Sequence, residues 1–244
     1  MRKPKILDLF CCQGGAGVGY SLVGFDVVGV DINPQPKYPF SFFQADALSF
    51  DLSGFDAVHA SPPCQRYSNL TPEQSKKNHP DLISSVREKL IASGLPYVIE
   101  NVAGAKRELL NPVMLCGSMF GLRTRRHRFF ECSFPVVAPC VCDHSVMPLL
   151  VTTASKASRA LRASLGVKPK SVTNAPLAYG INWMDFNGLK EAIPPAYTEY
   201  IGKQLRAHVL CAERLPDTKE ARLTAYNSAM PGEAPEICEA QTSA

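Results

Sequence analysis

An apolar segment followed at once by a run of glycines constrains the fold of this chain more than any other feature. Residues 6–10 (Ile-Leu-Asp-Leu-Phe) predict a buried strand, and Gly14–Gly19 (Gly-Gly-Ala-Gly-Val-Gly) predicts a tight turn. A helix is expected to begin within residues 20–23. Residues 26–31 (Asp-Val-Val-Gly-Val-Asp) predict a second strand that ends in a carboxylate. Together these segments predict a βαβ unit and hence an α/β protein.

The glycine run and the acid that ends the second strand favour a bound adenosine-containing cofactor. Glycines let the backbone approach a ligand closely, and the Asp31 carboxylate can accept hydrogen bonds from both hydroxyls of a ribose. This pattern does not choose among a nicotinamide dinucleotide, a flavin and S-adenosylmethionine, and a glycine turn without a ligand is the alternative. A third short strand, 42–44, is followed by Asp46. The Asp46 carboxylate could accept a hydrogen bond from the exocyclic amine of adenine, or it could cap the turn that follows.

A cysteine follows another apolar segment, within the sequence Pro62-Pro63-Cys64-Gln65. Residues 56–60 predict a strand, so the Cys64 thiol is expected in a loop at the carboxyl end of the sheet. Ligands of open α/β sheets bind at that edge, and the two prolines fix the backbone ahead of the sulfur. Cys64 is therefore a candidate nucleophile, whereas a small buried cysteine is the commoner role for this residue type.

Length and charge indicate one main domain with a small appended lobe. The chain has 244 residues, of which 45% are hydrophobic, and its formal net charge is +4. Residues 144–184 contain bases but no acid, which favours contact with a polyanion. The first residues lead straight into the first strand rather than into an export segment, and no apolar run approaches about 18 residues. We therefore expect a cytoplasmic protein with reduced thiols and no membrane span.

Four further motifs follow in a definite order along the chain. They are Pro63-Cys64-Gln65, residues 98–102 (Val-Ile-Glu-Asn-Val), residues 126–128 (Arg-His-Arg) and residues 194–202 (Pro-Pro-Ala-Tyr-Thr-Glu-Tyr-Ile-Gly). With the first strand and the glycine run before them, this series resembles the cytosine-5 DNA methyltransferases. The resemblance covers about residues 5–131 and 189–210, and the short region between the last motifs suggests a compact member from a phage or prophage.

The resemblance implies a Rossmann-like S-adenosylmethionine-dependent methyltransferase sheet with a small, irregular target-recognition lobe. The catalytic and cofactor-binding domain would span residues 1–131 plus 189–212, the lobe 132–188, and a poorly ordered tail 213–244. The implied activity is DNA (cytosine-5-)-methyltransferase, acting on a cytosine flipped out of the duplex. The cofactor would be S-adenosyl-L-methionine, the partner double-stranded DNA, and the protein a monomer in the cytoplasm of a bacterial or phage-infected cell.

The candidate site residues fall into three groups. The resemblance gives as catalytic residues Cys64, Glu100, Asn101, Arg126 and Arg128. It gives as cofactor-binding residues Phe10, Gly14, Gly15, Asp31, Ile32, Asp46, Pro63 and Gly202. The polar segment after the candidate nucleophile and the acid-free stretch supply the candidates for nucleic-acid contact, which are Gln65, Ser68, Lys76, Lys77, Lys156, Arg159 and Arg162.

The chemistry assigns a distinct role to each catalytic candidate. Cys64 would add as a thiolate to carbon 6 of cytosine, favoured by nearby cations such as Arg128. Glu100 would supply a proton to ring nitrogen 3, and Asn101 would fix the nucleophile loop. Three alternatives stay open: the same reaction on cytosine in transfer RNA, a DNA-binding relative without turnover, and a nicotinamide oxidoreductase.

Two features depart from the resemblance or stand outside it. Cys12 occupies a position where the family usually has glycine, so its backbone is expected to avoid positive φ. Donors suited to tetrahedral zinc occur at Cys132, Cys140, Cys142 and His144. The Cys-x-Cys-x-His spacing is tighter than usual zinc patterns, so we expect free cysteines and no metal.

Overall fold

Seven strands form a single sheet in the computed structural model, which describes residues 2–69, 71–145 and 175–212. The strands are β1 (Lys5–Leu9), β2 (Asp26–Asp31), β3 (Ser41–Gln44), β4 (Ala57–Ala60), β5 (Tyr97–Asn101), β6 (Val113–Leu115) and β7 (Arg128–Cys132). Their order is β3-β2-β1-β4-β5-β7-β6, and β7 is antiparallel to both of its neighbours. This order is that of Rossmann-like S-adenosylmethionine-dependent methyltransferases, so the predicted fold class is confirmed.

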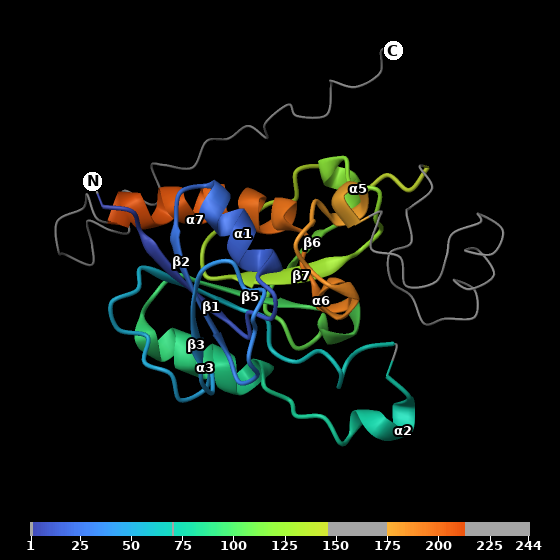
Figure 1. The fold of residues 1–244 in the computed structure, drawn as a ribbon, viewed down its shortest axis with the longest axis horizontal. Helices are drawn as coiled ribbons and strands as arrows, with labels where there is room; N and C mark the ends of the chain where they lie inside the picture. Colours follow the sequence, from blue (N-terminus) through green and yellow to red (C-terminus); the bar gives the residue numbers. More distant parts are fainter. Residues whose placement is uncertain (1, 70, 146–174, 213–244) are drawn as a thin grey trace, which may run out of the picture.

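Helices cover both faces of the sheet. The longer ones are α1 (Gly15–Leu22), α3 (Ile83–Ser93) and α7 (Pro195–Ala212), and the shorter ones are α2 (Glu73–Lys76), α5 (Ala175–Tyr179) and α6 (Phe186–Glu191). Two 3-10 turns, η1 (Ala103–Ala105) and η2 (Gly117–Phe120), follow β5 and β6. Figure 1 shows α1 and α7 together on one face of the sheet and α3 on the opposite face. No helix of the described residues is long and apolar enough to cross a membrane.

Consecutive residues of β1 contribute to two separate cores. Ile6 packs with Tyr20 and Tyr197 beneath α1 and α7, whereas Leu7 packs with Leu90 beneath α3. Successive side chains of a strand point to opposite faces, and a parallel sheet covered on both faces is apolar on both. The near-continuous apolar character of the first strand therefore follows from its place in the middle of a three-layer structure.

The predicted turn over Gly14–Gly19 is wrong for most of its length, because α1 already begins at Gly15. Only Gly14 has the left-handed backbone that favours glycine, with φ of 83°. Gly19 lies within α1, where an added Cβ would overlap Thr198 Oγ1 and Pro195 O. Part of the glycine run therefore permits close packing of α7 on α1 rather than a turn.

Both ends of the predicted lobe, 132–145 and 175–188, belong to the described residues. The second of them packs against the loop between β1 and α1, residues 10–14. Trp183 Nε1 donates to Gln13 O at 2.9 Å, and Gln13 Nε2 donates to Asp185 Oδ1 at 3.2 Å. α6 also crosses the predicted boundary at residue 189. The predicted tail 213–244 and three predicted nucleic-acid contacts lie outside the described residues; these contacts are Lys156, Arg159 and Arg162.

Candidate active site

The predicted catalytic residues converge on one edge of the sheet. Cys64 follows β4, Glu100 and Asn101 lie at the end of β5, and Arg128 begins β7. β4 and β5 are parallel neighbours, and β7 runs antiparallel to β5, with Glu100 paired to Phe130. The ends of β4 and β5 therefore meet the beginning of β7, which is the edge where ligands of open α/β sheets bind.

Glu100 and Arg128 form a nearly buried ion pair. Arg128 Nε lies 2.9 Å from Glu100 Oε1, and the two side chains are 14% and 7% exposed. The same Oε1 is buried and accepts no hydrogen bond from the described residues. Burial raises the pKa of Glu100 above its usual range, although the positive charge of Arg128 opposes this effect. The site thus holds a carboxyl group that is paired with Arg128 and that binds a proton more readily than an exposed carboxyl group does.

The Cys64 thiol is half-buried beside this pair. Burial is the largest effect on it and raises its pKa, and the negative charge of Glu100 raises it further. The positive charges of Arg128 and Arg126 lower the same pKa, as the sequence predicted, but they do not outweigh burial. The resting state of Cys64 is therefore the protonated thiol.

Asn101 connects the nucleophile loop to β5. Its Nδ2 donates to Pro62 O at 3.0 Å, two residues before Cys64, and its Oδ1 accepts from Val102 N at 2.9 Å. The side chain is 1% exposed, and its hydrogen bond to Pro62 O is buried. Asn101 holds the backbone that carries the thiol and has little surface left for a substrate.

A buried hydrogen-bond chain behind Glu100 was not predicted from the sequence. Tyr20 OH lies 2.9 Å from His59 Nδ1, and His59 Nε2 lies 2.9 Å from Ser61 Oγ. Ser61 in turn hydrogen-bonds Glu100, which lowers the carboxyl pKa. Burial lowers the pKa of His59 to about 3, so the ring is neutral at physiological pH. A histidine within the apolar segment 56–60 was the sequence signal for this chain.

Arg126 links the site to the segment that precedes α7. Its Nη2 donates to Lys190 O at 2.5 Å, and its guanidinium lies over the Tyr179 ring, 5.5 Å from the ring centroid. Tyr197 OH donates to the backbone oxygen of Arg126 at 2.6 Å. Arg126 Nε is buried and makes no hydrogen bond to the described residues. The arginine is thus held in place, while its buried Nε has no hydrogen-bond acceptor among the described residues.

The predicted cofactor region lies at the ends of β1, β2 and β3. Asp31 Oδ2 accepts from Cys12 N at 3.1 Å, and Asp31 Oδ1 accepts from Asn33 N at 2.9 Å. Each carboxylate oxygen has two acceptor sites, so capacity for ribose hydroxyls remains. Ile32 is 67% exposed, which leaves an apolar surface for a base beside the acid. Asp46 is also exposed, but its Oδ1 accepts from Leu48 N at 3.0 Å, so it caps the following turn as well.

The other predicted cofactor residues occupy different surroundings. Gly15 lies against Ile193, whose carbonyl oxygen an added Cβ would overlap. Phe10 and Pro63 are half-buried next to the ends of β1 and β4. Gly202 lies in the contact between α7 and α1, where an added Cβ would lie 3.0 Å from Tyr20 Cδ1. Helix packing therefore accounts for Gly202, and its predicted contact with a cofactor stays a prediction.

Cys12 contradicts the expectation that its backbone avoids positive φ. Its φ is 46°, and that of Phe10 is 59°. The loop is held in this conformation by hydrogen bonds: Cys12 N donates to Asp31, and Gly14 N donates to Cys11 O at 3.0 Å. A left-handed backbone costs an L-residue about 1–2 kcal/mol. Cys12 thus has a strained backbone conformation in the loop between β1 and α1.

The predicted nucleic-acid contacts of the described region follow the nucleophile. Gln65 and Lys77 are exposed, Ser68 N donates to Cys64 O at 2.9 Å, and Lys76 Nζ pairs with Glu73 Oε2 at 2.8 Å. Figure 1 shows α2, which contains Lys76, projecting from the body of the sheet domain. These residues lie on a surface segment, and their contact with nucleic acid stays a prediction.

The four suggested zinc ligands do not form one cluster. Cys132 lies on β7 and packs against the core beneath α7, and Cys140 is likewise absent from the cluster described below. Cys142 and His144 do lie together, with Cys116 and His127. Neither Cys116 nor His127 was recognised in the sequence, because each is far from the Cys-x-His pair along the chain. Two of the four candidate donors named from the sequence therefore lie in this cluster, and Cys132 and Cys140 do not.

Solved structures with a similar fold share little sequence with this chain. One is an E. coli protein described as a DNA modification methyltransferase encoded within a prophage, with 21% identity and a TM-score of 0.39 over 52% of this chain and 45% of that chain. A DNMT2 variant from Spodoptera frugiperda is 18% identical, with a TM-score of 0.41 over 61% of this chain and 56% of that chain. A SAM-dependent methyltransferase from Agrobacterium tumefaciens is 20% identical, with a TM-score of 0.28 over 42% of this chain and 39% of that chain.

The match to each of the first two structures spans about half of the matched protein's length. No family model matches the chain, and no curated protein matches it.

Proposed function

We propose that the chain is a cytosine-5 methyltransferase that modifies cytosine in double-stranded DNA and uses S-adenosyl-L-methionine as the methyl donor. The observation that carries the proposal is the convergence of a thiol, a buried carboxyl group and an arginine at the edge of the sheet. Glu100 Oε1 lies 2.9 Å from Arg128 Nε, and the charges of both residues act on the pKa of Cys64. The order of the motifs, from the first strand to residues 194–202, supports the same reaction.

Glu100 and Cys64 are coupled in a way that suits addition to a pyrimidine. Carbon 5 of cytosine is a weak nucleophile until the Cys64 sulfur bonds to carbon 6 and the ring gains electron density. Glu100 in its protonated form donates a hydrogen bond to ring nitrogen 3, and the upward shift of its pKa by burial supports this role. Neutral Glu100 also no longer raises the pKa of Cys64, so burial is then the main effect that the two arginines oppose.

The later steps restore the aromatic ring. When bound, S-adenosyl-L-methionine would supply an electrophilic methyl group for transfer to carbon 5. Loss of the carbon 5 proton to a base then expels Cys64 as the thiolate. The flanking residues keep the geometry: Asn101 fixes the loop through Pro62 O, and Arg126 is anchored by Lys190 O. A base inside a duplex hides both carbons, so the nucleotide must leave the stack.

The cofactor region fits an adenosine-containing methyl donor. Asp31 retains acceptor capacity for ribose hydroxyls, and the exposed Ile32 lies beside it. Gly14 and Gly15 belong to the same loop, where an added Cβ would meet Pro39 and Ile193 respectively, so close packing of the protein requires glycine at both positions. Asp31 and Ile32 would bind and orient the donor.

The test is transfer of labelled methyl groups from S-adenosyl-L-methionine to unmethylated duplex DNA, followed by identification of the modified base. Cys64→Ser should abolish transfer while binding of S-adenosyl-L-methionine is kept. Cys211→Ser, which changes an exposed cysteine on α7, is the matched control and should keep full activity. Transfer that persists in Cys64→Ser, or a methyl group on any atom other than carbon 5, contradicts the proposal.

The same measurement separates the remaining alternatives. Transfer to transfer RNA but not to duplex DNA would change the substrate and leave the chemistry of Cys64 and Glu100 intact. Cofactor binding without transfer to either polymer would favour a binding protein. DNA that carries 5-fluorocytosine at the target position should trap a covalent adduct on Cys64, because fluorine cannot leave as a proton does.

A further inference from the structure

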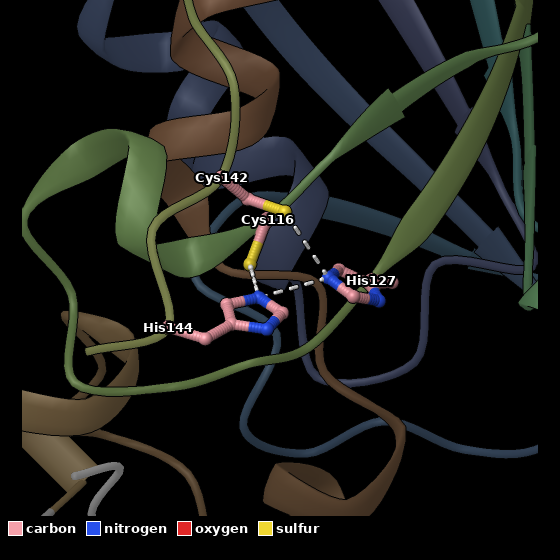
Figure 2. Close-up of side chains that lie close together, drawn as sticks. All are labelled: Cys116, His127, Cys142 and His144. Atoms are coloured by element: carbon pink, nitrogen blue, oxygen red, sulfur yellow. Dashed lines mark hydrogen bonds between the residues drawn. The ribbon is translucent and has the colours of Figure 1, made fainter. Parts of the chain in front are cut away.

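Two cysteines and two histidines converge on one point at the end of the β6–β7 hairpin, outside the proposed active site. The residues are Cys116, His127, Cys142 and His144, and their donor atoms all lie within 4.8 Å of one another. Figure 2 shows the four side chains pointing toward a common centre from three separate segments of the chain. Cys116 is buried, and the other three are half-buried.

From this cluster we infer that the protein binds a structural zinc ion through Cys116, His127, Cys142 and His144. Thiolate sulfur and imidazole nitrogen are the ligands that zinc prefers, and two of each is a common set for a closed tetrahedral site. Four protein ligands leave no open position for water or substrate. The ion is thus expected to stabilise the fold rather than to take part in methyl transfer, and this inference does not depend on the proposed function.

The distances between donor atoms match the edges of such a tetrahedron. Zinc–sulfur and zinc–nitrogen bonds of about 2.3 and 2.0 Å give edges of about 3.3 Å between two nitrogens and about 3.5 Å between nitrogen and sulfur. In the structure His127 Nε2 lies 3.2 Å from His144 Nε2, and His144 Nε2 lies 3.4 Å from Cys116 Sγ. Cys142 Sγ lies 3.8 Å from His127 Nε2. Three of the six distances between donor atoms are therefore within about 0.3 Å of the edges of a zinc tetrahedron, and the other three are no longer than 4.8 Å.

Hydrogen bonds within the cluster explain this arrangement less well than a cation does. Each neutral imidazole nitrogen offers either one N–H or one lone pair. His144 Nε2 nevertheless faces both Cys116 Sγ and His127 Nε2, and His127 Nε2 faces both His144 Nε2 and Cys142 Sγ. Each nitrogen can satisfy only one of its two neighbours. A cation at the centre uses a lone pair of every donor at once.

The local structure explains how residues distant in sequence meet here. Cys116 follows β6 and precedes η2, and His127 precedes β7 directly, so the antiparallel pairing of β6 with β7 brings the two together. Cys142 and His144 lie two residues apart on a segment without regular secondary structure. Arg125 Nη2 donates to His144 O and holds this segment, and Ser118 Oγ donates to Cys116 Sγ at 3.3 Å. A hydroxyl donor to a ligand sulfur is a typical outer partner of a metal site.

The position of the site indicates what the ion stabilises. His127 lies between Arg126 and Arg128, and Cys142 and His144 lie near the end of the described segment that follows β7, residues 133–145. Zinc would join this segment to the hairpin and fix the backbone that carries both arginines. A structural zinc ion stabilises a segment most where that segment makes few apolar contacts, and structural zinc commonly occurs in such places.

The experiment is metal analysis of the full chain, purified without a histidine tag and dialysed against zinc-free buffer. We expect about one zinc per chain in the unchanged protein, and a loss of affinity of more than roughly 100-fold in Cys142→Ser. Cys140→Ser is the matched control, because it changes a half-buried cysteine two residues away that is not in the cluster. This control should keep about one zinc per chain.

Cobalt(II) in place of zinc gives a readout that needs no variant. A tetrahedral site with two thiolates produces intense visible absorption and a thiolate-to-cobalt charge-transfer band, whereas an octahedral site does not. The inference is overturned if the unchanged protein retains no metal, if cobalt is octahedral, or if Cys140→Ser loses zinc as Cys142→Ser does. A Cys116–Cys142 disulfide in the metal-free protein would overturn it as well. Zinc retained by a protein without methyl transfer would contradict the proposed function alone.

Discussion

Arg128 Nε lies 2.9 Å from Glu100 Oε1 in surroundings that exclude most water, with the side chains 14% and 7% exposed. Removal of one member of a buried ion pair leaves the other charge without compensation, which typically costs about 3–5 kcal/mol. The two members are not equivalent, because a carboxylate can become neutral by taking up a proton and an arginine at neutral pH cannot. The cost of a substitution should therefore depend on which partner is left behind.

We predict that Glu100→Gln destabilises the protein by about 3 kcal/mol and that Arg128→Met destabilises it by about 1–2 kcal/mol. In the first variant Arg128 remains charged in a buried place beside Arg126, and in the second Glu100 becomes protonated. Urea denaturation of both variants and of the double variant measures the difference. Equal losses of stability in the two single variants would contradict the prediction.

Asn101 is predicted to control the position of the thiol. Asn101→Ala removes the donor to Pro62 O and the acceptor for Val102 N, and leaves both backbone groups without a partner in a buried place. The expected loss of stability is about 1–3 kcal/mol. The reactivity of Cys64 toward a thiol reagent should rise, because the loop that carries it is no longer held. Unchanged reactivity of Cys64 would show that Asn101 does not restrain this loop.

The sequence was sufficient for the parts of the site that depend on chain order. Cys64 lies in the loop after β4 and Glu100 lies next to the last residue of β5. Because parallel strands of one sheet end at the same edge, their meeting follows from the βαβ pattern and the motifs. The glycine run was harder to interpret. Gly14 does adopt a left-handed backbone, but Gly19 serves helix packing, and a glycine pattern does not distinguish these two uses.

The contacts that the sequence did not reveal depend on side-chain packing between distant segments. The series of hydrogen bonds from Tyr20 through His59 and Ser61 to Glu100 forms only when α1 packs on β4 and β5 in the correct position. Likewise, the partners of Cys142 and His144 are set by the β6–β7 pairing rather than by the tight Cys-x-His spacing. Spacing along the chain predicts metal ligands only when neighbouring residues supply most of them.

Asp8 should make stability depend on pH in a characteristic direction. The side chain is 1% exposed, its Oδ2 accepts from Tyr38 OH at 3.2 Å, and its Oδ1 accepts no hydrogen bond from the described residues. Burial raises the pKa of Asp8 from 3.8 to about 8. The native state thus keeps a proton that the unfolded state releases above about pH 4, so stability is lost as the pH rises from there through about 8.

Asp8→Asn, which resembles the protonated carboxyl group, should remove this dependence. The free energy of unfolding of the variant relative to the unchanged protein should increase with pH in that window, by at most about 1.4 kcal/mol per pH unit. Urea denaturation at several pH values provides the two curves. Asp26→Asn, which changes an exposed acid on β2, controls for the loss of one carboxyl group. Parallel curves for the unchanged protein and Asp8→Asn would contradict the assignment.

Cys12 provides a test of backbone strain at the glycine loop. Its φ of 46° lies in the left-handed region, which costs an L-residue about 1–2 kcal/mol and costs glycine almost nothing. Glycine also adds freedom to the unfolded chain, so we expect Cys12→Gly to stabilise the protein by about 0.5–1 kcal/mol. Cys12→Ala keeps the Cβ and the strain, and should give no such gain. Thermal and urea denaturation of both variants measure the effect, and an equal gain in Cys12→Ala would show that the thiol rather than the backbone is responsible.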